Sequence, residues 1–113
     1  MIINLSPVRM DEKLETSLSG EALTLNGEVF DFAPLEDGAT LPQEAIISKW
    51  IAGPVERVGG ELRLTIILPH GPTAPETTRY PQPLIVRGDG AISLPIYDIP
   101  QQAVTLIDKE EQQ

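Results

Sequence analysis

The chain has 113 residues, which is enough for one domain of modest size. Its 8 basic and 17 acidic residues give a formal net charge of −9, which argues against nucleic acid or an anionic membrane as the main partner. The sequence contains no cysteine, so a disulfide framework, a thiolate metal site and a thiol nucleophile are excluded. The 9 glycines and 11 prolines favour many turns over long helices.

Residues 22–32 predict a β-hairpin. Asn26-Gly27 lies between two alternating segments and is typical of a type I′ turn, because both residues tolerate positive φ. A short loop of this type gives the pairs Leu25–Glu28, Thr24–Val29 and Leu23–Phe30. In this register one face of the hairpin is apolar, and it carries Leu23, Leu25, Phe30 and Phe32.

Residues 54–68 predict a second hairpin with its turn at Gly59-Gly60. The predicted pairs are Val58–Glu61, Arg57–Leu62, Glu56–Arg63 and Val55–Leu64. One face of the second strand is apolar at every other residue, with Leu62, Leu64, Ile66 and Leu68. On the other face, Glu56 and Arg63 are expected to form a cross-strand ion pair.

Further strands are expected over residues 2–8, 14–18 and 103–107. A third hairpin is expected from residues 84–86 and 91–94, which flank the turn Arg87-Gly88-Asp89-Gly90. Residues 43–49 are expected to hold one helical turn, because Pro42 suits its first position. No stretch shows a sustained helical period, so no long helix is expected.

These elements predict an all-β fold, a mostly antiparallel β-sandwich or small barrel built from hairpins. Residues 1–68 are expected to form the main β unit, and the proline-rich residues 69–83 a loop with polyproline-II character. Residues 84–107 are too few to bury a core of their own, so they are expected to dock on the same chain or on a neighbouring one. The polar residues 108–113 are expected to fray.

Residue types with catalytic chemistry are sparse and lie outside known arrangements. His70 is the single histidine, and no carboxylate and hydroxyl are placed near it in a way that predicts a triad. The serines lie outside any G-x-S-x-G turn, and Gly59-Gly60 lacks the context of a phosphate-binding loop. With one histidine, no cysteine and no calcium-binding loop, no metal or other cofactor is expected. The sequence therefore predicts a protein that is not an enzyme.

The candidates for contact with a partner are aromatic, apolar and proline residues: Trp50, Ile51, Tyr80, Tyr97, Pro72 and Pro75. Each also has a simpler interpretation. A lone tryptophan is more often a core residue, and the loop of residues 69–83 is more often a stiff spacer. The three larger aromatics could also form a platform for a sugar. The tripeptide Arg87-Gly88-Asp89 is interpreted as a hairpin tip rather than an adhesion motif.

Several stretches resemble small proteins that tailed bacteriophages and prophages encode near their tail-fibre and tail-assembly genes. These stretches are MIINLSPVR at 1–9, ALTLNGEVFDFAPL at 22–35, GATLP at 38–42, GPVERVGGELRLTIILPHGP at 53–72 and ISLP at 92–95. The resemblance implies a virion-associated or assembly role and carries no functional residues with it. The expected partners are phage tail or tail-fibre proteins, or a second copy of the chain, and no nucleic acid or membrane.

Two alternatives remain open, a tail-fibre assembly chaperone and a module that binds the host surface or a glycan. The longest apolar runs are far shorter than the roughly 20 residues of a membrane helix, and residues 1–10 do not have the pattern of a signal peptide. Together with the resemblance, this predicts a protein of the bacterial host cytoplasm that is retained there or incorporated in the virion.

Overall fold

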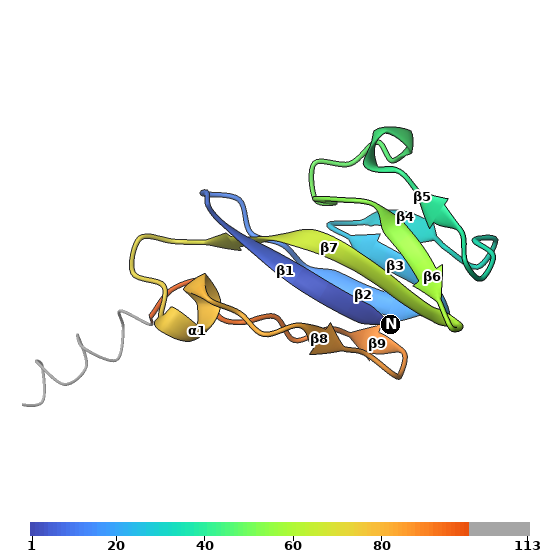
Figure 1. Ribbon diagram of the computed structural model, residues 1–113. Helices are drawn as coiled ribbons and strands as arrows, with labels where there is room; N and C mark the ends of the chain where they lie inside the picture. The colour runs from blue at the N-terminus through green and yellow to red at the C-terminus, as the bar shows by residue number, and fades with distance from the viewer. Residues whose placement is uncertain (100–113) are drawn as a thin grey trace, which may run out of the picture.

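A computed structural model describes residues 1–99 of the chain (Figure 1). Its strands are β1 (Ile2–Arg9), β2 (Thr16–Ser19), β3 (Ala22–Leu25), β4 (Glu28–Asp31), β5 (Thr40–Leu41), β6 (Val55–Val58), β7 (Glu61–His70), β8 (Leu84–Ile85) and β9 (Gly90–Ala91). Two short helices, η1 (Gln43–Ala45) and α1 (Glu76–Arg79), accompany them. The fold is therefore all-β in character, as the sequence predicts.

The strands form two sheets, named here after a central strand of each. The β7 sheet has five strands in the order β5-β6-β7-β1-β8, and the β3 sheet has four in the order β4-β3-β2-β9. The sheets are rich in antiparallel pairs and do not close into a barrel within residues 1–99. This confirms a mostly antiparallel β-sandwich, one of the two architectures that the sequence predicts.

The hairpin of β3 and β4 confirms the predicted turn and register. Asn26 has φ 47° and Gly27 has φ 84°, the positive values that a type I′ turn needs. The side chain of Asn26 also fixes the chain before β2, because its Oδ1 accepts from Glu15 N at 2.7 Å and its Nδ2 donates to Lys13 O at 2.9 Å. The observed pairs include the three predicted ones, from Leu25↔Glu28 to Leu23↔Phe30.

The hairpin of β6 and β7 turns at Gly59-Gly60, and three of its predicted pairs are observed: Val58↔Glu61, Arg57↔Leu62 and Glu56↔Arg63. The predicted ion pair between Glu56 and Arg63 is wrong, because the ion pairs of residues 1–99 do not include it. An ion pair near the surface gains little free energy, and forming it restricts two long side chains. Neighbouring positions in the strand register are therefore not enough to make Glu56 and Arg63 pair. Arg57 makes the ion pair of this strand instead, with Glu21.

The pairing of β1 with β7 is parallel and was not part of the prediction. It runs over eight residue pairs, from Ile2↔Arg63 to Arg9↔His70. Pro69 and His70, expected in the proline-rich loop, therefore belong to the end of β7. The remainder of that loop contains α1, whose Thr78 is buried and donates from Oγ1 to Ile96 O at 2.7 Å. A parallel partner far along the chain cannot be read from local pattern.

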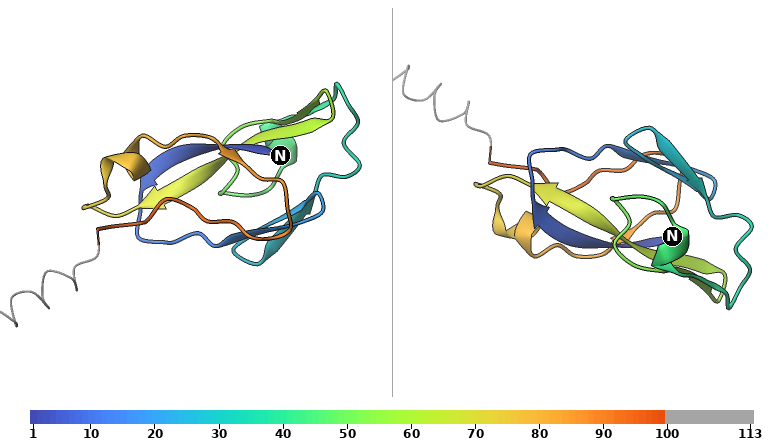
Figure 2. Two further views of the ribbon diagram at one scale, coloured as in Figure 1. Left: turned by 90° about the horizontal axis from the view of Figure 1, so that it is seen from below. Right: turned by 90° about the horizontal axis from the view of Figure 1, so that it is seen from above.

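The third predicted hairpin is wrong, because its two strands join different sheets. β8 pairs with β1 through Ile2↔Ile85, and β9 pairs with β2 through Ser17↔Ala91. The turn between them crosses from one layer to the other, as the orange chain in Figure 2 shows. Asp89 holds the crossing in place, since its Oδ1 accepts from Gly20 N at 2.9 Å. The described part of the C-terminal piece thus docks on its own chain. The predicted strand at 103–107 and the tail at 108–113 lie outside the described residues.

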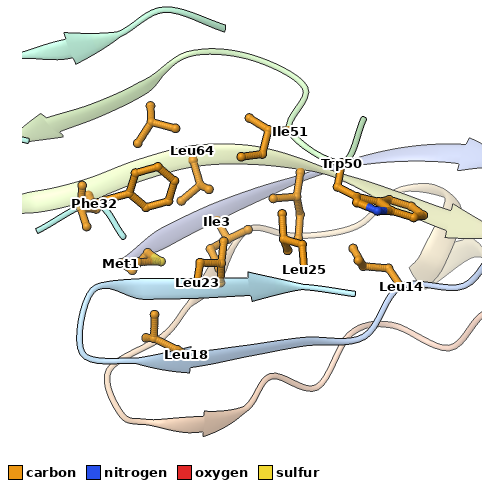
Figure 3. Close-up of a cluster of buried hydrophobic side chains, with 13 residues drawn as sticks. Met1, Ile3, Leu14, Leu18, Leu23, Leu25, Phe32, Trp50, Ile51 and Leu64 are labelled. Atoms are coloured by element: carbon orange, nitrogen blue, oxygen red, sulfur yellow. The ribbon is translucent and has the colours of Figure 1, made fainter. Parts of the chain in front are cut away.

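The core fills the space between the two layers. It contains three residues of each predicted apolar face, while Phe30 is only partly buried against it, and Figure 3 shows its side chains between the sheets. Its members are Met1, Ile3, Leu14, Leu18, Leu23, Leu25, Phe32, Trp50, Ile51, Val55, Leu62, Leu64 and Ile66. The helical turn predicted over residues 43–49 is confirmed only for Gln43–Ala45, as η1, and Pro42 is its N-cap rather than its first residue. No long helix interrupts the sandwich within residues 1–99.

The amino group of Met1 fastens β1 to its neighbours. Its ammonium donates to Glu61 Oε2 at 2.7 Å and to Val86 O at 3.1 Å, and the Met1 side chain is buried in the core. Glu61 also accepts from Arg87 Nη1. The two cations hold the pKa of Glu61 below its ordinary value of 4.5, chiefly through the hydrogen bond from the Met1 ammonium and secondly through that from Arg87.

Candidate interaction surface

Trp50 and Ile51 are enclosed in the core rather than exposed on a surface. Their exposed fractions are 4% and 2%, and Ile51 pairs in a β-bridge with Ile66. In Figure 3 the Trp50 ring lies at one end of the core, near Leu14 and Leu25. Burial removes both residues from the candidate contact surface and gives them a packing role. The sequence cannot show this, because a single aromatic residue has no pattern that tells which way it faces.

The other four predicted contact residues lie in the loop around α1 or on the segment bonded to it, since Gly71 N donates to Tyr97 O at 2.9 Å. Tyr80 is exposed and lies at the C-cap of α1, where the Arg79 guanidinium is 5.8 Å from its ring centre. Pro72 is exposed, and Pro75 is half-buried as the N-cap of the same helix. Tyr97 is half-buried, and its hydroxyl donates to Met10 O. Four residues thus stay accessible in part, without a shared groove that would make them a site.

A groove of about 400 Å³ runs beside β4, where the sequence predicted no site. One wall is β4 with the residue after it, and the other is the segment from β5 to just beyond η1. The lining residues are Val29, Phe30, Asp31, Phe32, Leu41, Ala45, Ile46 and Ile47. Ile47 is 91% exposed and Val29 62% exposed, values at which an apolar side chain has almost no packing partner in the chain itself. We call this feature the β4 groove.

The backbone of β4 faces this groove with free hydrogen-bonding groups. β4 is the last strand of the β3 sheet, so one of its edges has no neighbouring strand among residues 1–99. In an antiparallel hairpin, the residues that bond to the partner strand alternate with residues whose N–H and C=O point outward. Phe32 N donates to Glu21 O at 3.1 Å, which makes Glu21 and Phe32 a hydrogen-bonded pair. Bonded pairs recur at every second residue, so Leu23↔Phe30 is bonded as well. The outward groups are therefore those of Val29 and Asp31, and no hydrogen bond of residues 1–99 uses them.

The rim of the β4 groove is acidic. Glu28 and Asp31 lie on β4 itself, and Glu44 lies on η1 next to the lining residue Ala45. All three are exposed, and none takes part in an ion pair among residues 1–99. No Lys or Arg lines the groove. This arrangement can attract a cationic segment and place its backbone against an open strand edge.

A second groove, of about 570 Å³, lies between β2 and residues 91–97. Polar residues such as Glu15, Ser17 and Thr24 line it together with Tyr97, which is the setting that a sugar platform would need. The face of the Tyr97 ring is occupied, however, because the Lys13 ammonium lies 5.0 Å from its centre. This contact leaves that face unavailable for stacking on a sugar.

The described residues hold no group of three or more His, Cys, Asp or Glu side chains that could bind a metal ion. His70 lies at the end of β7, and its Nδ1 is 2.9 Å from Gly71 O. Across residues 1–99, no helix is long and apolar enough to span a membrane. Comparison of the chain with known protein families, with curated proteins and with solved structures found no match.

Proposed function

We propose that the chain is a non-enzymatic protein of a bacteriophage or prophage tail module, and that it acts by binding other proteins. The observation that carries this proposal is the β4 groove, where an open strand edge lies beside exposed apolar side chains. Such an edge is a template for pairing with another chain. The tail assignment is supported by the sequence resemblance of residues 1–9, 22–35, 38–42 and 53–72 to small phage proteins.

The experiment is to identify the proteins that the chain contacts in cells of the strain that encodes it. The chain is cross-linked during phage production, and particles are then purified and analysed by mass spectrometry. We expect cross-links to tail or tail-fibre proteins. Their retention in purified particles indicates a virion component, whereas cross-links found only before particle purification indicate an assembly chaperone.

Absence of tail-protein cross-links in both fractions would overturn the proposal. A control variant with Val29→Asp and Ile47→Asp carries added charge in the β4 groove at two exposed positions. Both side chains are exposed, so this variant is expected to fold. It should lose those cross-links that depend on the groove and keep any formed elsewhere.

A further inference from the structure

We propose that the β4 groove binds an extended segment of the partner that alternates apolar and basic residues, and that this segment adds a strand to the β3 sheet. The inference rests on the proposed function, since it names the chemistry of the protein partner. Three independent features of the groove determine that chemistry: its backbone groups, its apolar lining and its charge.

The backbone groups select an extended segment. Val29 and Asp31 are two residues apart, so their outward N–H and C=O groups repeat with the period of a β-strand. A helix has its own backbone groups bonded internally and cannot use this row. An extended chain can bond to both residues at once and become the new edge of the β3 sheet.

The apolar lining selects the side chains of every second residue in the bound segment. Successive side chains of an added strand point to opposite sides, so one set faces the groove wall built from Leu41, Ile46 and Ile47. Ile47 is 91% exposed among the residues that the structure describes, and a segment bound in the groove would cover it. An added strand would bury this apolar surface, and that burial would contribute favourably to the free energy of binding.

The acidic rim selects basic residues at the remaining positions. Glu28, Asp31 and Glu44 have no ion-pair partner among residues 1–99, in a chain of net charge −9. Asp31 points to the face of β4 opposite Glu28, so lysine or arginine side chains of the added strand on that face would lie beside Asp31. The other two carboxylates add to the negative potential around the groove. Complementary charge of this kind mainly sets which partner is accepted and how fast it associates.

The same charges argue against a second copy of the chain as the occupant. Two copies of β4 that pair antiparallel through the outward groups, about a twofold axis at Asp31, would set the two Asp31 side chains directly opposite each other. Every register of this pairing also brings the Glu28 and Asp31 carboxylates of both copies to one edge. Like charges directly opposite in a sheet are destabilising. Acidic residues at both ends of the strand thus protect this edge from self-pairing while leaving it open to a cationic segment.

The test is a titration of the isotope-labelled full chain with two short peptides, followed by NMR of its backbone amides. One peptide alternates Lys and Val, the other alternates Glu and Val, and both have blocked ends. We expect the Lys-Val peptide to bind about tenfold more tightly, because its cationic face meets the acidic rim of a chain with net charge −9. The amide shifts should gather at Val29–Asp31 and at Leu41–Ile47.

Matched variants separate the groove from the rest of the surface. Ile47→Ser should weaken binding of the Lys-Val peptide severalfold, whereas Ile85→Ser should leave it unchanged, because Ile85 is also exposed but lies on β8 at the far edge of the β7 sheet. The double variant Glu28→Lys and Asp31→Lys should reverse the preference between the two peptides. Equal binding of both peptides, binding of neither, amide shifts away from β4, or a chain that dimerises through β4 would each overturn the inference.

These outcomes are distinct from a failure of the proposed function. Tail proteins that cross-link to the chain without any binding of the Lys-Val peptide would leave the tail role in place and remove this site. Peptide binding at β4 without any tail-protein cross-link would keep the site and remove the tail role.

Discussion

Arg57 and Glu21 tie the two sheets of the sandwich together. Arg57 belongs to β6 of the β7 sheet, and its Nη1 donates to Glu21 Oε2 at 2.6 Å, in the turn that precedes β3 of the other sheet. The same guanidinium donates from Nε to Leu35 O at 2.6 Å and from Nη2 to Phe32 O at 3.1 Å. One side chain thus satisfies two backbone carbonyls and one carboxylate from the opposite layer.

Arg57→Ala is therefore expected to destabilise the fold by about 2–3 kcal/mol, because it removes several charge-assisted bonds and leaves the Leu35 carbonyl without its donor. The Phe32 carbonyl keeps its bond from Leu35 N at 3.0 Å. Glu21→Gln should cost less than about 1 kcal/mol, since the Glu21 side chain is 42% exposed. Urea denaturation measures both free energies of unfolding. Equal effects of the two variants would show that the carboxylate, and not the carbonyls, dominates this contact.

The stability of the fold should fall with acid through Glu61. Its pKa in the folded chain lies below the ordinary 4.5, mainly because the Met1 ammonium donates to its carboxylate. Folding therefore favours the ionised form, and this contribution is fully present above the unfolded pKa and is lost as the pH falls through the folded pKa. We expect the difference in unfolding free energy between the parent chain and Glu61→Gln to be largest near neutral pH and to shrink below about pH 4.5.

Denaturation of both proteins over this pH range measures the effect, with Glu36→Gln as the control. Glu36 is exposed and forms no ion pair among residues 1–99. A difference for Glu61→Gln that stays constant over the whole range would show that the carboxylate does not act through its charge.

Two buried threonines should respond to loss of their hydroxyl in opposite directions. Thr16 Oγ1 is buried without a hydrogen-bond partner within residues 1–99, so Thr16→Val should stabilise the fold by about 1 kcal/mol. Thr78 Oγ1 donates to Ile96 O at 2.7 Å, and Thr78→Val should destabilise it by about 1–2 kcal/mol. Thermal and urea unfolding of the pair provide the measurement, and shifts of the same sign would contradict this account.

Asn26 should show separable effects of its backbone and its side chain. Asn26→Gly keeps a residue that tolerates φ 47° but loses the bonds to Glu15 and Lys13, at a cost of about 1 kcal/mol. Asn26→Ala loses the same bonds and adds the strain of positive φ, for a total of about 2 kcal/mol. Urea denaturation should therefore rank the parent chain first, the Gly variant second and the Ala variant last. An Ala variant as stable as the Gly variant would mean that the turn changes its type.

The sequence predicts the local parts of this fold and not its long-range parts. Asn26-Gly27 and Gly59-Gly60 determine their hairpins because turn type and register depend on a few adjacent residues. The parallel partner of β1 and the separation of β8 from β9 depend on which strand edges meet in three dimensions. No local pattern carries that information.

The candidate site was missed for the same reason. The β4 groove forms only where β4 meets the segment that contains Ile46 and Ile47, far along the chain from it. Trp50 is a predicted contact residue because a large aromatic side chain can anchor an interface, yet its side chain completes the core. Composition identifies the residues whose large side chains favour burial. It does not tell whether such a side chain is buried in the core of the chain or in an interface with a partner.

The parallel pairing of β1 with β7 also sets an order of events in folding. The hairpins of β3 with β4 and of β6 with β7 can each close as soon as their own residues are available, whereas Ile2 must find Arg63 on one side and Ile85 on the other. Contacts between such distant residues carry the larger loop-closure cost and form more slowly. β1 therefore leaves the ribosome before β7 and β8 and must wait for both before it is paired. Pro7, in the middle of β1, has no N–H to offer during that delay, which makes the waiting strand a poorer template for aggregation.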